Sequence, residues 1–370
     1  MIKVCHLTSV HESNDVRIFV KECSSLSKAG FDVYLVAKGD SREQNGVKVI
    51  GQGEAPRNRL MRILCFTKKI YKTGLSLDCD IYHLHDPELL PIAVKLVKHG
   101  KKVIYDSHEK YSEQIKIKGY LPACVSKIIS MIYEKYESRV LKKIHAVIFP
   151  CLYKGKNPFD GKCQIVETID NLPLLNELYE QYDPCVQKVD RSACYIGGLS
   201  EARGVSNFIK AAFLAHSIAF LGGSFDSKEY ENQLKSMPEY SCAEYYGQLN
   251  RQQVLELLQK SIIGMANLRN VGQYNKYDNL ATKVYEYMSL GMPVILSKSD
   301  YNEKMMKMFQ FGICVDPDNI EETANAMKYL YDNPEIAHQM GLNGRKAIVE
   351  RFNWEIESKK LTSLYMKLYK

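Results

Sequence analysis

Residues 278–295 read DNLATKVYEYMSLGMPVI, a run in which a polar loop leads into a helical pattern and then into a strand. Gly291 ends the helical pattern, and the apolar residues that follow have the composition of a strand buried in a parallel sheet. The free amides at the start of a helix attract anions. Lys283, one turn inside the helix, adds a positive charge, and Glu286 can accept hydrogen bonds from hydroxyl groups. This segment therefore predicts a ligand that carries both phosphate and hydroxyl groups.

Residues 195–205, YIGGLSEARGV, supply a second loop of the same kind. A buried strand leads into Gly197 and Gly198, whose missing side chains let the backbone approach a phosphate closely. Arg203 stands at the start of the next helix, where its guanidinium and the helix amides can neutralise that phosphate. A pair of glycines alone is weak evidence, and a simple turn is the alternative interpretation. The position of this loop ahead of residues 278–295 strengthens the phosphate interpretation.

Short apolar runs alternate with helical patterns along almost the whole chain, which indicates βαβ units and parallel sheets. The expected strands form one series at 2–8, 32–37, 81–85, 102–106 and 145–149, and a second at 193–196, 217–221, 242–246, 261–266, 293–297 and 311–315. The polar stretch 181–190 reads as a linker. We therefore expect an α/β protein with one Rossmann-like domain at 1–183, another at 191–352 and a terminal helix at 353–370. Two such domains would face each other across a cleft at the carboxyl ends of their strands.

Polar residues cluster in three segments of the first domain, which read CHLTSVHESNDVRIF at 5–19, IYHLHDPE at 81–88 and VIYDSHE at 103–109. Imidazoles gather at zinc sites, so His83, His85 and His108 are candidates for one. No cysteine or carboxylate falls at a spacing that completes a known zinc site, and no metal is therefore expected. Two Asp-x-Asp triplets, at 78–80 and 316–318, are also interpreted without a metal. The first precedes its strand, and the second leads into a helix expected at 320–331, of which Asp318 or Asn319 would be the N-cap.

Together these motifs resemble glycosyltransferase family 4, whose members have the two-domain GT-B fold. Residues 278–286 resemble the EX7E signature of that family, with Asp278 in the place of its first glutamate, and residues 197–204 resemble its donor loop. The segments 5–19, 81–88, 103–109 and 341–355 also resemble parts of family members. In that family the last helix crosses back onto the first domain.

The resemblance implies a retaining transferase that takes its sugar from a nucleotide diphosphate sugar and uses no metal or other cofactor. It implies that Asp278 holds the donor sugar, that Glu286 holds the ribose and that His108 abuts the sugar. The donor-binding residues would be Gly197, Gly198, Arg203, Gly204, Asn279, Leu280, Ala281, Thr282, Lys283 and Glu286. Those on the acceptor side would be His11, Arg17, His85 and Asp86. A nucleotide-sugar 2-epimerase of the same fold and a non-catalytic nucleotide-sugar-binding subunit are the alternatives.

Charge is distributed unevenly along the chain. Residues 1–150 hold 25 Lys and Arg against 16 Asp and Glu, a net charge of +9, whereas the remainder has a net charge of −2. A helix expected near 58–73 carries apolar residues on one face and basic residues on the other: Leu60, Ile63, Leu64, Ile70 and Tyr71 against Arg59, Arg62, Lys68, Lys69 and Lys72. Such a helix either lies on an anionic membrane or covers a sheet with its basic face in water.

The remaining features concern location. Eleven cysteines are scattered singly, and the sequence has neither a leader pattern nor an apolar stretch long enough to span a bilayer. We expect a cytoplasmic protein bound peripherally to the inner face of a membrane. Its acceptor would be a lipid-linked saccharide or oligosaccharide in the synthesis of capsule, O-antigen or a related polysaccharide. A nucleic acid partner is not expected, because no helix-turn-helix, finger or RNP pattern is present.

Overall fold

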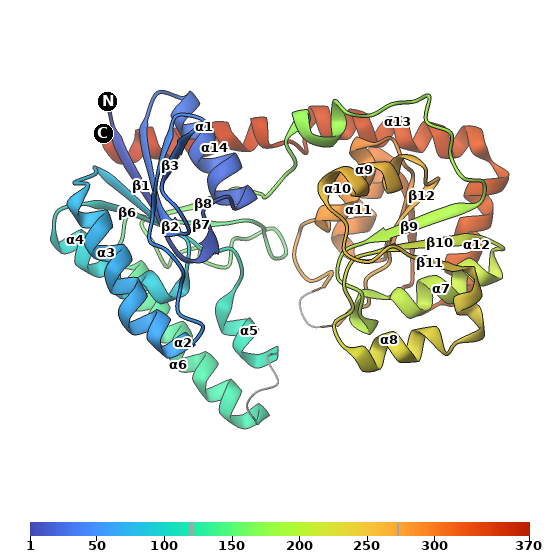
Figure 1. Ribbon diagram of the computed structural model, residues 1–370, viewed down its shortest axis with the longest axis horizontal. Coiled ribbons are helices and arrows are strands. Elements are labelled where there is room, and N and C mark those ends of the chain that lie inside the picture. The colour runs from blue at the N-terminus through green and yellow to red at the C-terminus, as the bar shows by residue number, and fades with distance from the viewer. Residues whose placement is uncertain (118–121, 272–273) are drawn as a thin grey trace. The chain divides into compact units, whose positions relative to one another are not determined.

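The computed structural model describes residues 1–117, 122–271 and 274–370. It divides into two compact units (Figure 1): unit 1 comprises Met1–Asn171 and Glu355–Lys370, and unit 2 comprises Leu172–Trp354. Each unit contains one sheet covered by helices, as the alternating sequence pattern predicts.

Unit 1 contains a sheet of eight strands in the order β3-β4-β2-β1-β5-β6-β7-β8. Neighbouring strands run parallel, except that β3 pairs with β4 in antiparallel fashion. The strands are β1 (Lys3–Glu12), β2 (Asp32–Lys38), β3 (Arg42–Gln44), β4 (Val47–Gly51), β5 (Ile81–Leu84), β6 (Lys102–Asp106), β7 (Ala146–Phe149) and β8 (Ile165–Thr168). Five of them lie where the apolar runs predict strands.

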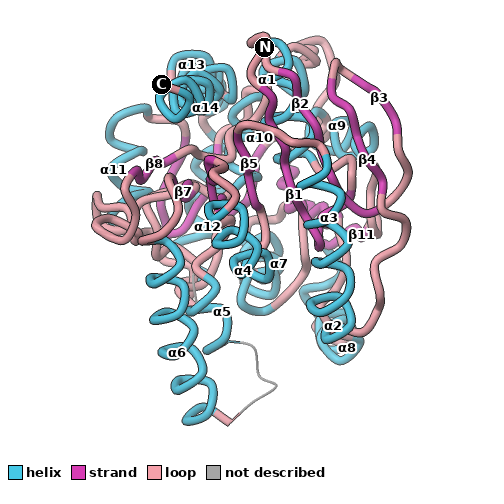
Figure 2. The backbone as a smooth tube through the Cα atoms, turned by 90° about the vertical axis from the view of Figure 1, so that its left-hand side faces the viewer, coloured by secondary structure: helices cyan, strands magenta, loops and turns pink. Residues whose placement is uncertain are grey.

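Helices join and cover these strands, and α3 packs along β1 and β2 (Figure 2). The helices of unit 1 are α1 (Ser24–Lys28), α2 (Arg59–Met61), α3 (Thr67–Ser76), α4 (Leu90–Lys98), α5 (Tyr111–Ile117), α6 (Ala123–Leu141) and α14 (Trp354–Tyr369). A wider helical turn, Val16–Cys23, precedes α1, and another, Arg62–Phe66, joins α2 to α3. From residue 355 onward α14 belongs to unit 1, and its Tyr365 is fully buried there.

Unit 2 contains six parallel strands in the order β11-β10-β9-β12-β13-β14. This is the doubly wound order in which the first strand of the unit, β9, lies at the centre and the chain switches direction between β9 and β12. The strands are β9 (Ser192–Ile196), β10 (Ile218–Gly222), β11 (Ala243–Tyr245), β12 (Ile263–Ala266), β13 (Val294–Ser297) and β14 (Gly312–Val315). The helices are α7 (Val205–Leu214), α8 (Lys228–Lys235), α9 (Arg251–Gln259), α10 (Thr282–Ser289), α11 (Asp300–Phe309), α12 (Ile320–Asp332) and α13 (Pro334–Glu350).

The change from one unit to the next falls between Asn171 and Leu172, earlier than the linker expected at 181–190. The reason lies in the apolar residues of the intervening segment. Leu172 and Leu178 are buried in the core of unit 2, and Tyr179 and Tyr182 pack against that core. The polar composition of 181–190 therefore marks a surface loop of unit 2 and not the boundary itself.

Candidate functional site

The glycine loop of unit 2 lies at the switch point of its sheet. Gly197 follows β9 directly and has a φ of +133°, a conformation that residues with a side chain rarely adopt. Gly204, at the start of α7, has a φ of +72°, and a Cβ atom added there would lie 2.3 Å from the carbonyl oxygen of Asn267. Asn267 follows β12, so the glycine lets the loop after β9 approach the loop after β12. Ligands of open α/β sheets bind at such switch points.

Two cations approach this loop from different helices. A Cβ atom added at Gly197 would lie 3.4 Å from Arg203 Nη1 and 3.4 Å from Lys283 Nζ. Arg203 Nε donates to the hydroxyl of Tyr274 at 3.1 Å, which fixes the guanidinium beside the loop. The structure thus brings together the residues that the sequence assigns to a diphosphate, although Arg203 and Lys283 lie 80 positions apart in the chain.

Lys283 lies in α10 and is buried, with its ammonium 3.2 Å from the centre of the Tyr195 ring. Its Nζ has no hydrogen-bond partner among the described residues. Burial, together with the nearby charge of Arg203, lowers the pKa of Lys283 well below its usual value. A buried cation without a partner has a free-energy cost that an anionic ligand would remove.

The start of α10 supplies the other predicted donor residues. The helix begins at Thr282, and the side chain of its N-cap residue, Ala281, makes no capping hydrogen bond. Leu280 is buried in the core of unit 2, whereas Asn279 is exposed and Asp278 is half-buried in the preceding loop. The N-cap residue therefore offers no side-chain oxygen to the first amides of α10, unlike the Ser, Thr, Asp or Asn that usually caps a helix.

Glu286 lies one turn further along α10 and has a partner that the sequence did not indicate. Its carboxylate is 2.6 Å from Arg251 Nη1 in α9, and Arg251 Nη2 is 3.3 Å from Glu177. Asn267 is a second such residue. It is fully buried, and neither polar atom of its amide has a hydrogen-bond partner among the described residues. The only signal for Asn267 is its position directly after a buried strand.

In unit 1 the switch point lies between β1 and β5, and Asp86 links the loops that follow these strands. Its Oδ2 accepts hydrogen bonds from Thr8 Oγ1 at 2.8 Å and from the amides of Ser9 and Val10 at 2.6 and 3.2 Å. Asp86 is buried, so its role within unit 1 is to hold the β1 loop in place. His11, on that loop, is 3.5 Å from Asp86 and 3.3 Å from Asp15, and its side chain is 29% exposed.

Arg17 and Asp106 form a buried bidentate pair. Arg17 Nε and Nη2 donate to the two carboxylate oxygens at 3.0 and 3.1 Å, and Arg17 also reaches the carbonyl oxygen of Ile169. Burial alone would raise the pKa of Asp106, but Arg17 and the neighbouring His108 hold it well below its usual range. His108 Nε2 lies 3.3 Å from Asp106, and the imidazole is 21% exposed. This geometry fixes the orientation of His108 while leaving an edge of the ring accessible.

Of the four residues expected on the acceptor side, the structure leaves only His11 accessible. Arg17, His85 and Asp86 are buried and bound to groups of the protein, so they can position a site but cannot touch an acceptor directly. His85 contacts His108 through Nδ1 at 3.2 Å and His6 through Nε2 at 2.9 Å. Burial lowers the pKa of His85 to about 4, so this ring is neutral at physiological pH.

The Asp-x-Asp triplets make contacts within the chain. Asp78 pairs with Lys101, and Asp318 pairs with Arg269. Asn319 caps α12, since its side chain accepts a hydrogen bond from the amide of Glu322. These carboxylates are therefore occupied by contacts within the chain.

The fold and the site geometry can be compared with those of known proteins. Solved structures with the same fold include sucrose-phosphate synthase from Thermosynechococcus elongatus, which is 15% identical over 100% of this chain and 99% of its own, with a TM-score of 0.73. A glycosyltransferase from Rickettsia africae is 14% identical over 100% and 99% of the two chains, with a TM-score of 0.74. The HepE protein of Anabaena in complex with UDP-glucose is 13% identical over 99% and 100%, with a TM-score of 0.69. The fold is that of the GT-B glycosyltransferases.

A family match falls in the second half of the chain. Residues 186–347, which include the glycine loop, Lys283 and Glu286, match the family described as glycosyl transferases group 1. This match covers less than half of the 370 residues, and it agrees with the resemblance to glycosyltransferase family 4 that the motifs carry. No curated protein sequence matches the chain closely enough to serve as a relative.

Proposed function

We propose that the protein transfers a sugar from a nucleoside diphosphate sugar to a hydroxyl group of a saccharide acceptor, with retention of anomeric configuration. The observation that carries this proposal is the pair of cations at the glycine loop, because Arg203 and Lys283 both approach Gly197 at the switch point of unit 2. A diphosphate is the ligand that two cations, a glycine backbone and a helix start with alanine at its N-cap would bind together. The similar structures whose names include UDP or UDP-glucose support a donor of this class.

The same groups would promote departure of the nucleotide. Negative charge grows on the diphosphate as the bond to the sugar breaks, and Arg203, Lys283 and the first amides of α10 are placed to stabilise it. The departing phosphate oxygen would take the proton of the acceptor hydroxyl on the same face of the sugar. In this proposal Glu286 binds the ribose, Asp278 binds the hydroxyls of the donor sugar, and His108 contacts the sugar during transfer.

Neutralisation of the diphosphate by protein cations removes the need for a divalent metal on the nucleotide. The Asp78 and Asp318 carboxylates are paired with Lys101 and Arg269 and are not arranged to hold such a metal. We therefore propose that transfer proceeds without magnesium or manganese.

We further propose that the acceptor is linked to lipid and that unit 1 rests on an anionic membrane surface. Among the described residues, no helix combines the length and apolar composition needed to cross a bilayer. Apolar side chains are nevertheless exposed at the end of unit 1 where α2 and the start of α6 lie (Figure 1). They are Leu60, Met61 and Leu64 near α2, and Val125, Ile128, Ile129, Met131 and Ile132 in α6. The excess of basic residues in this half of the chain matches an anionic surface.

Contacts of the basic residues in 58–73 suggest which of them would face the membrane in this proposal. Arg62 is paired with Glu88 at 3.0 Å, and Lys69 Nζ donates to the carbonyl oxygen of Gln52 at 2.7 Å. Lys68 and Lys72 are exposed, whereas the side chain of Arg59 lies outside the described part of the chain. Lys68 and Lys72 are therefore the better candidates for contact with lipid head groups.

A transfer assay with a set of nucleoside diphosphate sugars and a mixture of lipid-linked and free saccharides tests the proposal. We expect release of nucleoside diphosphate only when both donor and acceptor are present, with the α- or β-configuration of the donor retained in the product. Formation of the 2-epimer from the donor alone would instead identify the epimerase alternative. Tight nucleotide-sugar binding without transfer, epimerisation or hydrolysis would identify the non-catalytic alternative.

A further inference from the structure

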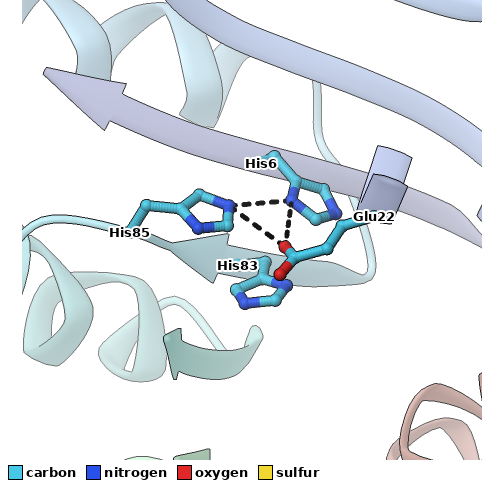
Figure 3. Close-up of side chains that lie close together, drawn as sticks. All are labelled: His6, Glu22, His83 and His85. Atoms are coloured by element: carbon cyan, nitrogen blue, oxygen red, sulfur yellow. Dashed lines mark hydrogen bonds and ion pairs between the residues drawn. The ribbon is translucent and has the colours of Figure 1, made fainter. Parts of the chain in front are cut away.

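Four ligand-type side chains converge in the interior of unit 1, close to the β1–β5 switch point (Figure 3). We call this group the histidine cluster; its members are His6, Glu22, His83 and His85. His6 of β1 is the register partner of His83 of β5, and His85 lies two residues further along the same face. Glu22 comes from the helical turn Val16–Cys23. All four side chains are buried, and one ligand atom of each lies within 4.8 Å of the others.

The distances within the cluster match a single bound cation. His6 Nδ1 lies 2.9 Å from His85 Nε2, and these atoms lie 3.9 and 3.8 Å from Glu22 Oε2. These three distances are the sides of a triangle. The point in its plane that is equidistant from the three atoms lies about 2.1 Å from each of them. Zn–N and Zn–O bonds in proteins are about 2.0–2.2 Å long. His83 would supply the fourth ligand from outside this plane.

The other nitrogen of each imidazole is already fixed by a neighbouring group. The hydroxyl of Tyr365 lies 2.7 Å from His83 Nδ1 and 3.1 Å from His6 Nε2. His85 Nδ1 faces His108 at 3.2 Å and Asp106 at 3.7 Å. Metal-bound histidines usually have such a partner on the distal nitrogen, which sets the tautomer and the direction of the ring.

Among the inner atoms, His6 Nδ1 and His85 Nε2 contact each other at 2.9 Å, whereas those of Glu22 and His83 lack the hydrogen bonds that buried polar groups normally make. Among the described residues, no hydrogen bond reaches either carboxylate oxygen of Glu22 or His83 Nε2. Glu22 Oε1 has an ion-pair contact with Arg17 Nε at 3.1 Å, and Arg17 is shared with Asp106. Buried polar atoms without partners are rare in folded proteins, and Glu22 Oε2 and His83 Nε2, two such atoms in one cluster, favour a bound ion.

We propose that the histidine cluster binds one divalent metal ion of the zinc class, with three imidazoles and one carboxylate as ligands. The ion would tie β1, the turn Val16–Cys23 and β5 together, and through Tyr365 it would connect them to α14. It would also fix His85, which in turn contacts His108. Because every ligand is buried, we assign the ion a structural role that is separate from neutralisation of the nucleotide.

The first experiment measures metal in the protein itself. Chain purified without an affinity tag and without chelator is unfolded in the presence of a zinc-sensitive dye. We expect about one zinc per chain, released only on unfolding. Refolding with Co²⁺ in place of Zn²⁺ should produce the visible absorption of a four-coordinate site. His338→Gln is the matched control, since His338 is exposed and far from the cluster in sequence, and this variant should retain its zinc.

Glu22→Gln and His83→Gln distinguish a metal from a protonated cluster. Glutamine imitates a protonated glutamate, so without a metal Glu22→Gln would keep the melting temperature of the original chain. With a metal, the variant should hold less than about a tenth of the zinc and melt about 5 °C or more lower. If a variant does not fold, the original chain refolded with and without Zn²⁺ gives the same comparison. Less than about a tenth of an equivalent in every preparation, with no gain in melting temperature on refolding with Zn²⁺, would overturn the proposal.

Discussion

Lys283 Nζ lies 3.2 Å from the centre of the Tyr195 ring, beneath the glycine loop of unit 2. The ring gives the ammonium its closest electrostatic contact, and among the described residues no hydrogen-bond acceptor reaches it. The lysine is thus kept buried beside Arg203, and among the described residues its ammonium forms no hydrogen bond with an acid. We interpret this arrangement as a diphosphate site that is formed before the ligand arrives, which is the condition for efficient stabilisation of a leaving group.

The first prediction concerns proton uptake. Burial lowers the pKa of Lys283 well below its usual value, and a bound diphosphate would raise it again because it favours the charged amine. The affinity for nucleoside diphosphate should therefore be greatest at pH values below the pKa that Lys283 has in the free protein. It should fall as the pH rises from that value towards the higher pKa that Lys283 has in the complex. Calorimetry in buffers of different ionisation enthalpy, at a series of pH values below the usual lysine pKa of about 10.4, should detect proton uptake on binding. The Lys283→Arg variant should show none, and equal uptake by both proteins would contradict the assignment.

The second prediction concerns chelation. Because Arg203 and Lys283 provide the positive charge at the nucleotide, brief treatment with EDTA should leave transfer unchanged. A metal in the histidine cluster would not alter this result, since buried ligands release their ion only when unit 1 opens. Activity before and after treatment is compared, with magnesium or manganese added back. Loss of activity that either metal restores at once would show that a metal acts on the nucleotide.

A third prediction follows from Glu137, a buried residue of α6 whose carboxylate accepts a hydrogen bond from Tyr133 at 3.1 Å. Burial raises the pKa of Glu137 to about 7. A raised carboxyl pKa means that the folded state keeps its proton while the unfolded state loses it, so this residue lowers stability as the pH rises from the unfolded value to about 7. We compare the free energy of unfolding of Glu137→Gln with that of the original chain. This difference should shift in favour of the variant by about 2–3 kcal/mol between pH 4.5 and pH 8.

Thermal unfolding at several pH values measures this effect. Glu134→Gln is the control from the same helix: burial alone would raise the pKa of Glu134, but Lys110 and Lys162 lower it. Its substitution should therefore cost stability at neutral pH. If Glu137→Gln gave no relative gain between acid and neutral pH, its carboxyl would already be ionised in the folded protein.

The fourth prediction tests the membrane surface. Vesicles that contain anionic lipid should sediment the protein at low salt and release it at high salt, because the screening length falls from about 10 Å at 0.1 M to about 3 Å at 1 M. Lys68→Glu with Lys72→Glu should weaken binding at low salt, and Ile128→Ser with Ile132→Ser should weaken it at both salt concentrations. Lys304→Glu in unit 2 is the charge control. A protein that ignores anionic vesicles at low salt would have solvated basic residues and a soluble acceptor.

Local sequence patterns predicted most of the fold. The eleven expected strands are all present, because an apolar run between turn residues is sufficient to indicate a buried parallel strand. The strands that the sequence did not predict are edge strands or lie next to the edge. The Arg42–Gln44 strand is largely exposed, and every residue of the Ile165–Thr168 strand is half-buried, so neither has the apolar run on which the prediction depends. In the Val47–Gly51 strand only Val47 and Val49 are buried, and Lys48 lies between them, so this strand also lacks a continuous apolar run.

Residues of the candidate site could be named from the sequence where a short motif contains them, but not where distant segments meet. Gly197 and Lys283 belong to two recognisable motifs. Arg251, which pairs with Glu286, lies in a helix without any motif. The histidine cluster is a second example. From the sequence alone, no carboxylate could be assigned to a zinc site with His83 and His85. The structure places Glu22 beside them, although its spacing from His83 in the sequence does not indicate a contact. Only the sheet register and the packing of the turn Val16–Cys23 bring them together.

The most direct test of the account is the affinity for UDP, measured by calorimetry at pH 7.5 with the original chain and two site variants. Loss of a charge-assisted hydrogen bond typically costs about 1.5–3 kcal/mol, so Arg203→Ala and Lys283→Met should each weaken binding about tenfold or more. Lys304→Met, on the exposed face of α11, is the control and should bind as the original chain does. If UDP is not bound, the other nucleoside diphosphates are tested in the same way. Binding of a nucleoside diphosphate with equal affinity to the original chain and to both site variants would contradict the assignment of the donor site.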